Sequence, residues 1–226
     1  MKSFQFRKAV AADVGQIFGV LKSTWPEQDT DQEQVLKALK SSSHSSFVTI
    51  LDERIVGFVD GFMTTSFDGD KRWEVDLLAV HPSARGKRIG QELVNQCVQA
   101  GIQRKADYSR AGIQINNKAS QYTFQRIGFQ MQPQISRIMV SSKIVNGEER
   151  VIDGLHLIPV DTMNYSGLWI ENNLSYDGLL AAQIYQSKRE YALAGAVIPN
   201  DLKVEQEAAR DLGFEEIDEY QWWFIK

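Results

Sequence analysis

The sequence predicts an α/β (α+β) protein in which helices flank a β-sheet. Two observations lead to this prediction. Apolar residues recur at helical spacing in several segments, and between these segments lie short β-type runs separated by polar turns. The hydrophobic content of 43% and the charged content of 24% are typical of a soluble globular protein, and 226 residues suffice for a sizeable core.

In the first part of the chain, we expect strands at residues 4–8, 47–51, 55–62, 73–80, 111–115 and 134–142, and helices at 11–21, 31–39, 89–98 and 117–127. Asp52-Glu53-Arg54 connects two of these strands as a hairpin turn. Pro82 ends the strand before it, because proline lacks a backbone donor. Gly128 suits the end of a helix. We expect the strand at 134–142 to close this part of the sheet.

After a polar turn at residues 146–150, the pattern repeats more faintly, with strands at 150–160, 167–171, 191–198 and 217–224 and helices near 179–186 and 204–212. Leu212-Gly213-Phe214 repeats Ile127-Gly128-Phe129 at a spacing of 85 residues. We therefore predict two domains, residues 1–145 and 146–226. The second would complete the core or form a dimer surface.

The most informative stretch runs from Trp73 to Gln91, where a strand leads through a basic turn with two glycines into a helix. Such a turn presents successive backbone N–H groups at a helix N-terminus, where the helix dipole also favours an anion. Glycine allows the close approach of a phosphate, and three cations flank the turn. The pattern indicates a pyrophosphate-binding site, although it could also be an ordinary basic turn.

This stretch resembles the acyl-CoA signature of the GNAT superfamily of N-acetyltransferases, Gln/Arg-x-x-Gly-x-Gly/Ala. Arg85 and Gly90 match the ends of the signature, and Arg88 stands at its first glycine. A second signature, Asn-x-x-Ala-x-x-x-Tyr-x-x-x-Gly-Phe, is matched by Asn117, Ser120, Phe124, Gly128 and Phe129, with Phe124 in place of tyrosine.

The resemblance implies the GNAT fold, a mixed, mostly antiparallel sheet with flanking helices, over about residues 4–140, followed by a partial second GNAT-like unit. It also implies acetyl-CoA as co-substrate, bound by Leu78, Ala79, Val80, Arg85, Gly86, Lys87, Arg88, Ile89, Gly90, Gln91, Asn117 and Phe124. Asn117 could equally be a helix cap. Residues 172–178 contain no arginine or lysine, so we do not expect the second unit to bind CoA.

Two carboxylates, Glu74 and Asp76, are the candidate catalytic bases. Their spacing of two places both on one face of the strand. In the resembled mechanism an amine attacks the thioester directly, and a base must first remove a proton from the ammonium group. The alternative is plain surface acidity. Phe124 has no hydroxyl to protonate the leaving thiolate, and Tyr122 points elsewhere on the helix.

The leading hypothesis is therefore an acetyl-CoA-dependent N-acetyltransferase that acts on a primary amine. The alternative is a catalytically silent acetyl-CoA-binding sensor or scaffold. We expect no metal, because no two histidines are spaced as ligands and Cys97 is the one cysteine. The net charge of −4 argues against a nucleic-acid partner. We also expect no membrane span, a cytoplasmic location and a homodimer as a candidate assembly.

Overall fold

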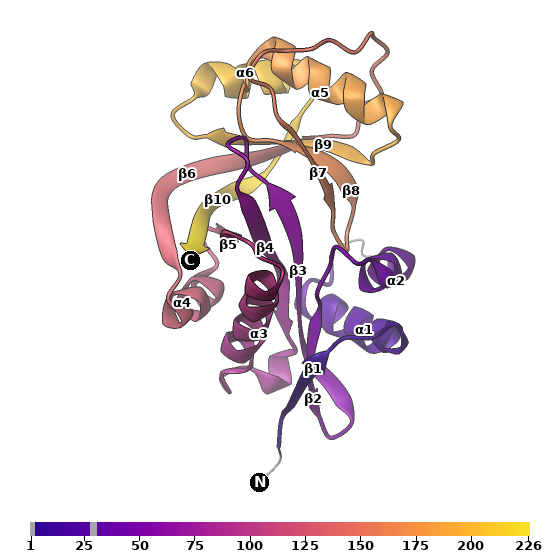
Figure 1. Ribbon diagram of the computed structural model, residues 1–226, viewed down its shortest axis with the longest axis vertical. Helices are drawn as coiled ribbons and strands as arrows, with labels where there is room; N and C mark the ends of the chain where they lie inside the picture. The colour runs from indigo at the N-terminus through magenta and orange to yellow at the C-terminus, as the bar shows by residue number, and fades with distance from the viewer. Residues whose placement is uncertain (1–2, 28–30) are drawn as a thin grey trace.

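The computed structural model describes residues 3–27 and 31–226 of the chain (Figure 1). Within these residues the strands form one mixed sheet, in the order β1-β2-β3-β4-β5-β10-β6-β9-β8-β7. Its strands are β1 (Gln5–Lys8), β2 (Phe47–Leu51), β3 (Arg54–Thr65), β4 (Lys71–Val80), β5 (Tyr108–Gln114), β6 (Gln130–Ser141), β7 (Leu157–Asp161), β8 (Ser166–Ile170), β9 (Leu193–Pro199) and β10 (Glu215–Ile225).

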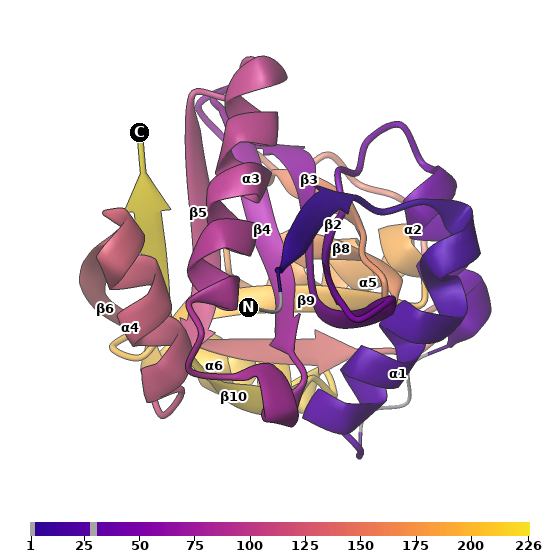
Figure 2. The same ribbon diagram turned by 90° about the horizontal axis from the view of Figure 1, so that it is seen from below.

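Helices cover both faces of the sheet (Figures 1 and 2). They are α1 (Val14–Thr24), α2 (Gln32–Lys40), α3 (Ile89–Gln103), α4 (Lys118–Ile127), α5 (Tyr176–Lys188) and α6 (Lys203–Asp211). Helix α3 packs on the face of β3 and β4 that carries Trp73 and Val75, whereas α1 and α2 pack on the opposite face, around Phe58. Helices α5 and α6 cover the second half, at one end of the molecule.

The two halves exchange their last strands. In the first half, β4 is parallel to β5, and the strand antiparallel to β5 is β10 from the end of the chain. In the second half, β8 is parallel to β9, and the strand antiparallel to β9 is β6. Strands β6 and β10 also pair with each other. The expectation that residues 134–142 close the first half is therefore wrong, because β10 occupies the position beside β5.

The predicted repeat is visible in the backbone. Gly128 ends α4 with φ of 105°, and Gly213 follows α6 with φ of 84°. In each case the amide after the glycine donates a hydrogen bond to a carbonyl of the preceding helix. The Phe129 amide donates to the Phe124 carbonyl at 3.1 Å, and the Phe214 amide donates to the Ala209 carbonyl at 2.9 Å. The division at residue 145 stays a prediction, and both halves contribute to one sheet.

Several boundaries differ from the expected ones, among them those of β6 and β7. Strand β6 begins at Gln130 rather than residue 134, because Met131 and Gln130 already pair with β10. Strand β7 begins at Leu157 rather than residue 150, because the segment before it makes turn-like contacts such as the amide of Leu155 with the carbonyl of Ile152.

The exchange predicts that a lesion in β10 destabilises the whole chain. Trp223 is 5% exposed and lies in the core of the first half, although it belongs to the last strand. Replacing a buried tryptophan with alanine costs about 3–5 kcal/mol. We expect Trp223→Ala to lower the free energy of unfolding by that amount in one cooperative transition.

The control is Ile217→Ala on the same strand, since Ile217 is 55% exposed and should change stability little. Urea unfolding followed by circular dichroism measures both variants. Separate transitions for the two halves in Trp223→Ala would contradict the shared core.

Candidate functional site

The turn between β4 and α3 has the geometry that the sequence predicts for an anion-binding site. Gly86 has φ of 77° and Arg88, directly before the helix, has φ of 60°. Both lie in the left-handed region, which favours glycine. This explains why a glycine is usual at the position of Arg88 in the signature. The amides of the first helical turn have no partner within the helix and point towards the turn.

A cavity of about 570 Å³ opens at this turn. Nine of the predicted cofactor-binding residues line it, namely Leu78, Val80, Arg85, Gly86, Arg88, Ile89, Gly90, Gln91 and Asn117. Ala79, Lys87 and Phe124 are not among its lining residues. Phe124 is 3% exposed and packs edge-on against Phe129 in the core, with ring centroids 4.9 Å apart.

Asn117 fits both of the roles expected for it. Its side-chain oxygen accepts a hydrogen bond from the Ser120 amide at 3.1 Å and so caps α4. The same residue lines the cavity. Gly90 faces the cavity where α3 passes α4, and a Cβ placed on it would meet Thr123 Cγ2 at 3.5 Å, an ordinary contact.

Strands β4 and β5 pair over only three positions, Arg72 to Glu74 with Tyr108 to Arg110. Strand β4 then bulges, since Phe58 pairs with Ala79 but Asp60 pairs with Asp76. Leu77 has φ of 47° within this bulge. Backbone groups of β4 beyond Glu74 are therefore left without ladder partners in β5, as an extended ligand chain between the strands would require.

The Glu74 carboxylate lies in a buried network of charges. Arg110 Nε donates to both of its oxygens at 2.9 Å, and Thr64 donates to Oε1. Both Arg72 and Arg110 also donate to Glu171, which directly follows β8 in the second half. Glu74 is 3% exposed. Its oxygens are thus engaged in holding the two halves together.

Asp76, two residues further along β4, is in a different environment. It is half-buried, and burial followed by the charge of Asp60 raises its pKa to about 7. Its charge contributes, after burial, to raising the pKa of Tyr165 above the ordinary value. Burial and the charge of Asp218 raise the pKa of Tyr220, with a smaller contribution from Asp76. Asp76 is therefore close enough to Tyr165 and Tyr220 of the second half to interact with them electrostatically.

The family model for the acetyltransferase (GNAT) family matches residues 14–129, which is more than half of the chain. The chain belongs to this family. It is accordingly an acyltransferase, and the predicted fold class, with its second GNAT-like unit, is confirmed. The GNAT match covers the cavity, the bulge in β4 and both candidate bases.

Several known proteins resemble this chain, each over a different share of its length. The L-amino acid N-acyltransferase MnaT of Escherichia coli (strain K12) is 24% identical over 140 residues, 58% of this chain and 81% of its own. A putative acetyltransferase from Pyrococcus horikoshii superimposes with a TM-score of 0.63 at 12% identity, over 98% of this chain and 89% of its own. Its fold therefore matches both halves.

A glucosamine N-acetyltransferase region of a fungal multidomain β-N-acetylglucosaminidase superimposes over the full chain, with a TM-score of 0.66 at 12% identity. The chain spans 38% of that protein's length. Another GNAT fold neighbour, a putative acetyltransferase from Salmonella typhimurium solved with acetyl-CoA, matches 59% of this chain and 83% of its own, with a TM-score of 0.52 at 22% identity.

Several residues of the candidate site could not be found by sequence reasoning. Thr24 and Trp25 line the cavity from the end of α1, which extends beyond the expected helix at residues 11–21. Glu171, Tyr165 and Tyr220 reach the site from the second half, and no local motif marks them.

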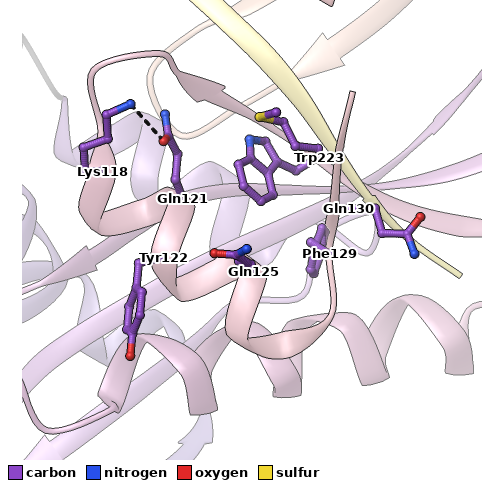
Figure 3. A pocket seen from close by; sticks show the side chains of 8 residues that line it. Lys118, Gln121, Tyr122, Gln125, Phe129, Gln130 and Trp223 are labelled. Atoms are coloured by element: carbon purple, nitrogen blue, oxygen red, sulfur yellow. Dashed lines mark hydrogen bonds between the residues drawn. The ribbon is translucent and has the colours of Figure 1, made fainter. Parts of the chain in front are cut away.

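A second cavity of about 510 Å³ lies beside α4, against the beginning of β6 and the end of β10 (Figure 3). Tyr122 lines both cavities. Trp223 lines the second one, and its indole Nε1 has no hydrogen-bond partner in the described structure. Tyr122 is 54% exposed and accepts a hydrogen bond from Arg126 at 3.0 Å.

Over residues 3–27 and 31–226, no cluster of three or more metal-ligating side chains was found. In the same part of the chain, none of the helices combines the length and the apolar character needed to cross a membrane. Cys97 is buried, as expected for a core thiol, and burial raises its pKa far above the ordinary value.

The network around Glu74 predicts a large loss of stability when this carboxylate is removed. Glu74→Gln leaves Arg110 buried and only partly compensated, and breaking a buried pair in this way costs about 3–5 kcal/mol. Chemical denaturation measures this loss. Glu149→Gln is the control, because Glu149 pairs with Arg189 at the exposed surface. Equal effects of both substitutions would contradict a central role for the network.

The cavity predicts that a negative charge at Gly90 weakens acetyl-CoA binding. We expect Gly90→Asp to reduce the affinity about tenfold or more, because the carboxylate would repel phosphates at the start of α3. Gly90→Asn is the matched control, with nearly the same size and no charge. Isothermal titration calorimetry measures both. If Gly90→Asp and Gly90→Asn bind acetyl-CoA with equal affinity, the phosphates of acetyl-CoA do not lie beside Gly90.

Proposed function

We propose that the protein transfers the acetyl group of acetyl-CoA to a primary amine by direct attack of the amine on the thioester. The observation that carries this proposal is the cavity at the start of α3, which combines first-turn amides, glycine-like backbone and the cations Arg85 and Arg88. These groups would hold the phosphates. The edge of β4 from Leu78 to Val80, which has no ladder partner in β5, would hold the pantetheine arm.

Asp76 is the base in this proposal. A free amine near pKa 10 is protonated at neutral pH, so the reaction needs an acceptor for its proton. The pKa of Asp76, about 7, suits this task, and its position two residues before Leu78 places it near the bulge. Glu74 supports the strand from its arginine network rather than exchanging protons.

The acceptor amine would approach from the side of the second half. Asp76 and Asp218 supply negative charge there, and Tyr165 and Tyr220 supply aromatic surface. This combination favours a cationic amine. A homodimer and a cytoplasmic location stay predictions.

Phe124 is the observation that keeps a second function open. It stands at the position of the signature tyrosine, is buried in the core and has no hydroxyl. A silent module would bind acetyl-CoA without releasing thiol in the presence of an amine. Thiolates leave readily at neutral pH, so turnover does not require that hydroxyl.

The test of Asp76 is its replacement with asparagine, which keeps the size and removes the base. We expect Asp76→Asn to lower kcat by about 10²–10⁴-fold, with acetyl-CoA affinity nearly unchanged. Amine-dependent thiol release and calorimetry measure the two quantities. In the wild-type protein, kcat should rise with pH through about 7 and this rise should be absent in the variant. If Asp76→Asn retains the activity of the wild-type protein, another group accepts the proton.

The same substitution has a predicted effect on stability. Because the pKa of Asp76 is raised from 3.8 to about 7, the folded state holds this proton more tightly than the unfolded state, and stability falls as pH rises from about 4 to 7. Asp76→Asn removes this cost. At pH 8 we expect the Tm of Asp76→Asn to exceed that of the wild-type protein by about 2–4 °C for each kcal/mol of unfolding free energy regained. This difference in Tm should shrink as the pH is lowered towards 4. Thermal unfolding at both pH values measures it.

A further inference from the structure

Two aspartates stand opposite each other in the middle of the sheet. Asp60 of β3 and Asp76 of β4 are direct partners in the antiparallel ladder. Asp60 is fully buried and Asp76 half-buried. Like charges directly opposite each other destabilise a strand pair, and water cannot screen a buried carboxylate. The arrangement therefore needs a compensating positive charge.

His44 is placed to supply this charge. Its Nδ1 lies 2.6 Å from Asp60 Oδ2, and the hydroxyl of Ser46 donates to Oδ1 of the same carboxylate at 2.6 Å. The His44 side chain is 2% exposed. Burial lowers its pKa, but the hydrogen bond and the charge of Asp60, with smaller contributions from the backbone and the charge of Asp161, more than offset this, so the pKa lies above the ordinary value. The surroundings therefore favour the protonated ring beside the buried carboxylate.

The loop that carries His44 is fixed at several points. The Ser45 amide donates to the Gly61 carbonyl at 2.8 Å, and the rings of His44 and Phe62 are 5.5 Å apart. Arg104, just after α3, donates to the His44 carbonyl at 2.9 Å. The imidazole is therefore held in one place by β3 and by the end of the helix whose start lines the cofactor cavity.

The other titratable and charged groups around these residues leave His44 as the group that balances Asp60. Glu74 is bound by Arg72 and Arg110, and Asp161 at the end of β7 pairs with Lys37 at 3.2 Å. Arg104 uses its donors on the loop that carries His44 and stacks on Trp73. Cys97, Tyr165 and Tyr220 have pKa values raised by burial and stay neutral near pH 7.

We propose that the buried His44–Asp60 pair sets the charge around Asp76. Protonated His44 balances the charge of Asp60, so that Asp76 can take up and release a proton near neutral pH. This inference rests on the proposed function, in which Asp76 is the base. The pair touches neither substrate and acts through the charge it presents across the strand.

The test is the pH dependence of kcat in three variants of the full chain. His44→Gln removes the positive charge and leaves Asp60 facing Asp76, so the apparent pKa of the rate profile should rise by about half a unit or more. Asp60→Asn removes the negative charge and also the group that favours protonated His44, so the apparent pKa should fall. The double variant should resemble Asp60→Asn, because His44 is then no longer needed to balance a charge. A merely structural role would not shift the profile in opposite directions.

A second measurement does not depend on turnover. The carboxyl carbon signal of Asp76, assigned by comparison with Asp76→Asn, can be titrated by NMR in each variant and should show the same shifts. If Asp76→Asn abolishes activity but His44→Gln and Asp60→Asn leave both titrations unchanged, or shift them in one direction, the inference is overturned and the proposed base stands. If Asp76→Asn keeps full activity, the proposed base itself fails, whatever the NMR titration shows.

Discussion

Four charged side chains meet where β4 and β5 stop pairing, and the rest of the site depends on them. Glu74 and Arg72 come from β4, Arg110 from β5 and Glu171 from the segment after β8. Because these groups are largely buried, each carboxylate requires its arginine and each arginine its carboxylate. The network fixes the last paired position of the two strands. Beyond it β4 and β5 no longer pair, Asp76 comes next on the same face as Glu74, and the bulge in β4 follows.

The second half acts on this site in two ways. Through the exchange, β10 closes the sheet beside β5 and places Trp223 in the core of the first half. Through β7, β8 and the turn between them, it covers the face of β3 on which Phe62 packs against Ile158 and Val160. In the proposed reaction, the half without a basic glycine turn would supply the wall of the acceptor side, and the half with this turn would supply the cofactor side. The proposed site therefore needs both halves.

Much of this arrangement could be predicted from local sequence. The strand, basic turn and helix around Gly86 and Gly90 follow each other within twenty residues, so their spacing alone predicts the cavity. The repeat of Gly128-Phe129 at Gly213-Phe214 predicts a second unit of the same kind. Helix ends such as Asn117 also follow from side-chain chemistry.

The remaining features depend on contacts between distant residues. No pattern in residues 130–142 shows that their partner is β9 rather than β5, because strand pairing is decided by packing of both halves. Glu74 and Asp76 look equivalent in the sequence, and only Arg110 and Glu171 on one side and Asp60 on the other distinguish them. His44 lies in a polar serine-rich loop whose sequence gives no sign that its ring is buried against a carboxylate.

The most direct test is the release of free thiol from acetyl-CoA by the full chain in the presence of cationic primary amines, measured alongside calorimetric binding of acetyl-CoA. The account predicts that acetyl-CoA binds in the micromolar range and that thiol release depends on the amine and rises with pH through about 7. Binding without release for every amine in the series would contradict it, and would identify a GNAT fold that holds acetyl-CoA without acetylating an amine.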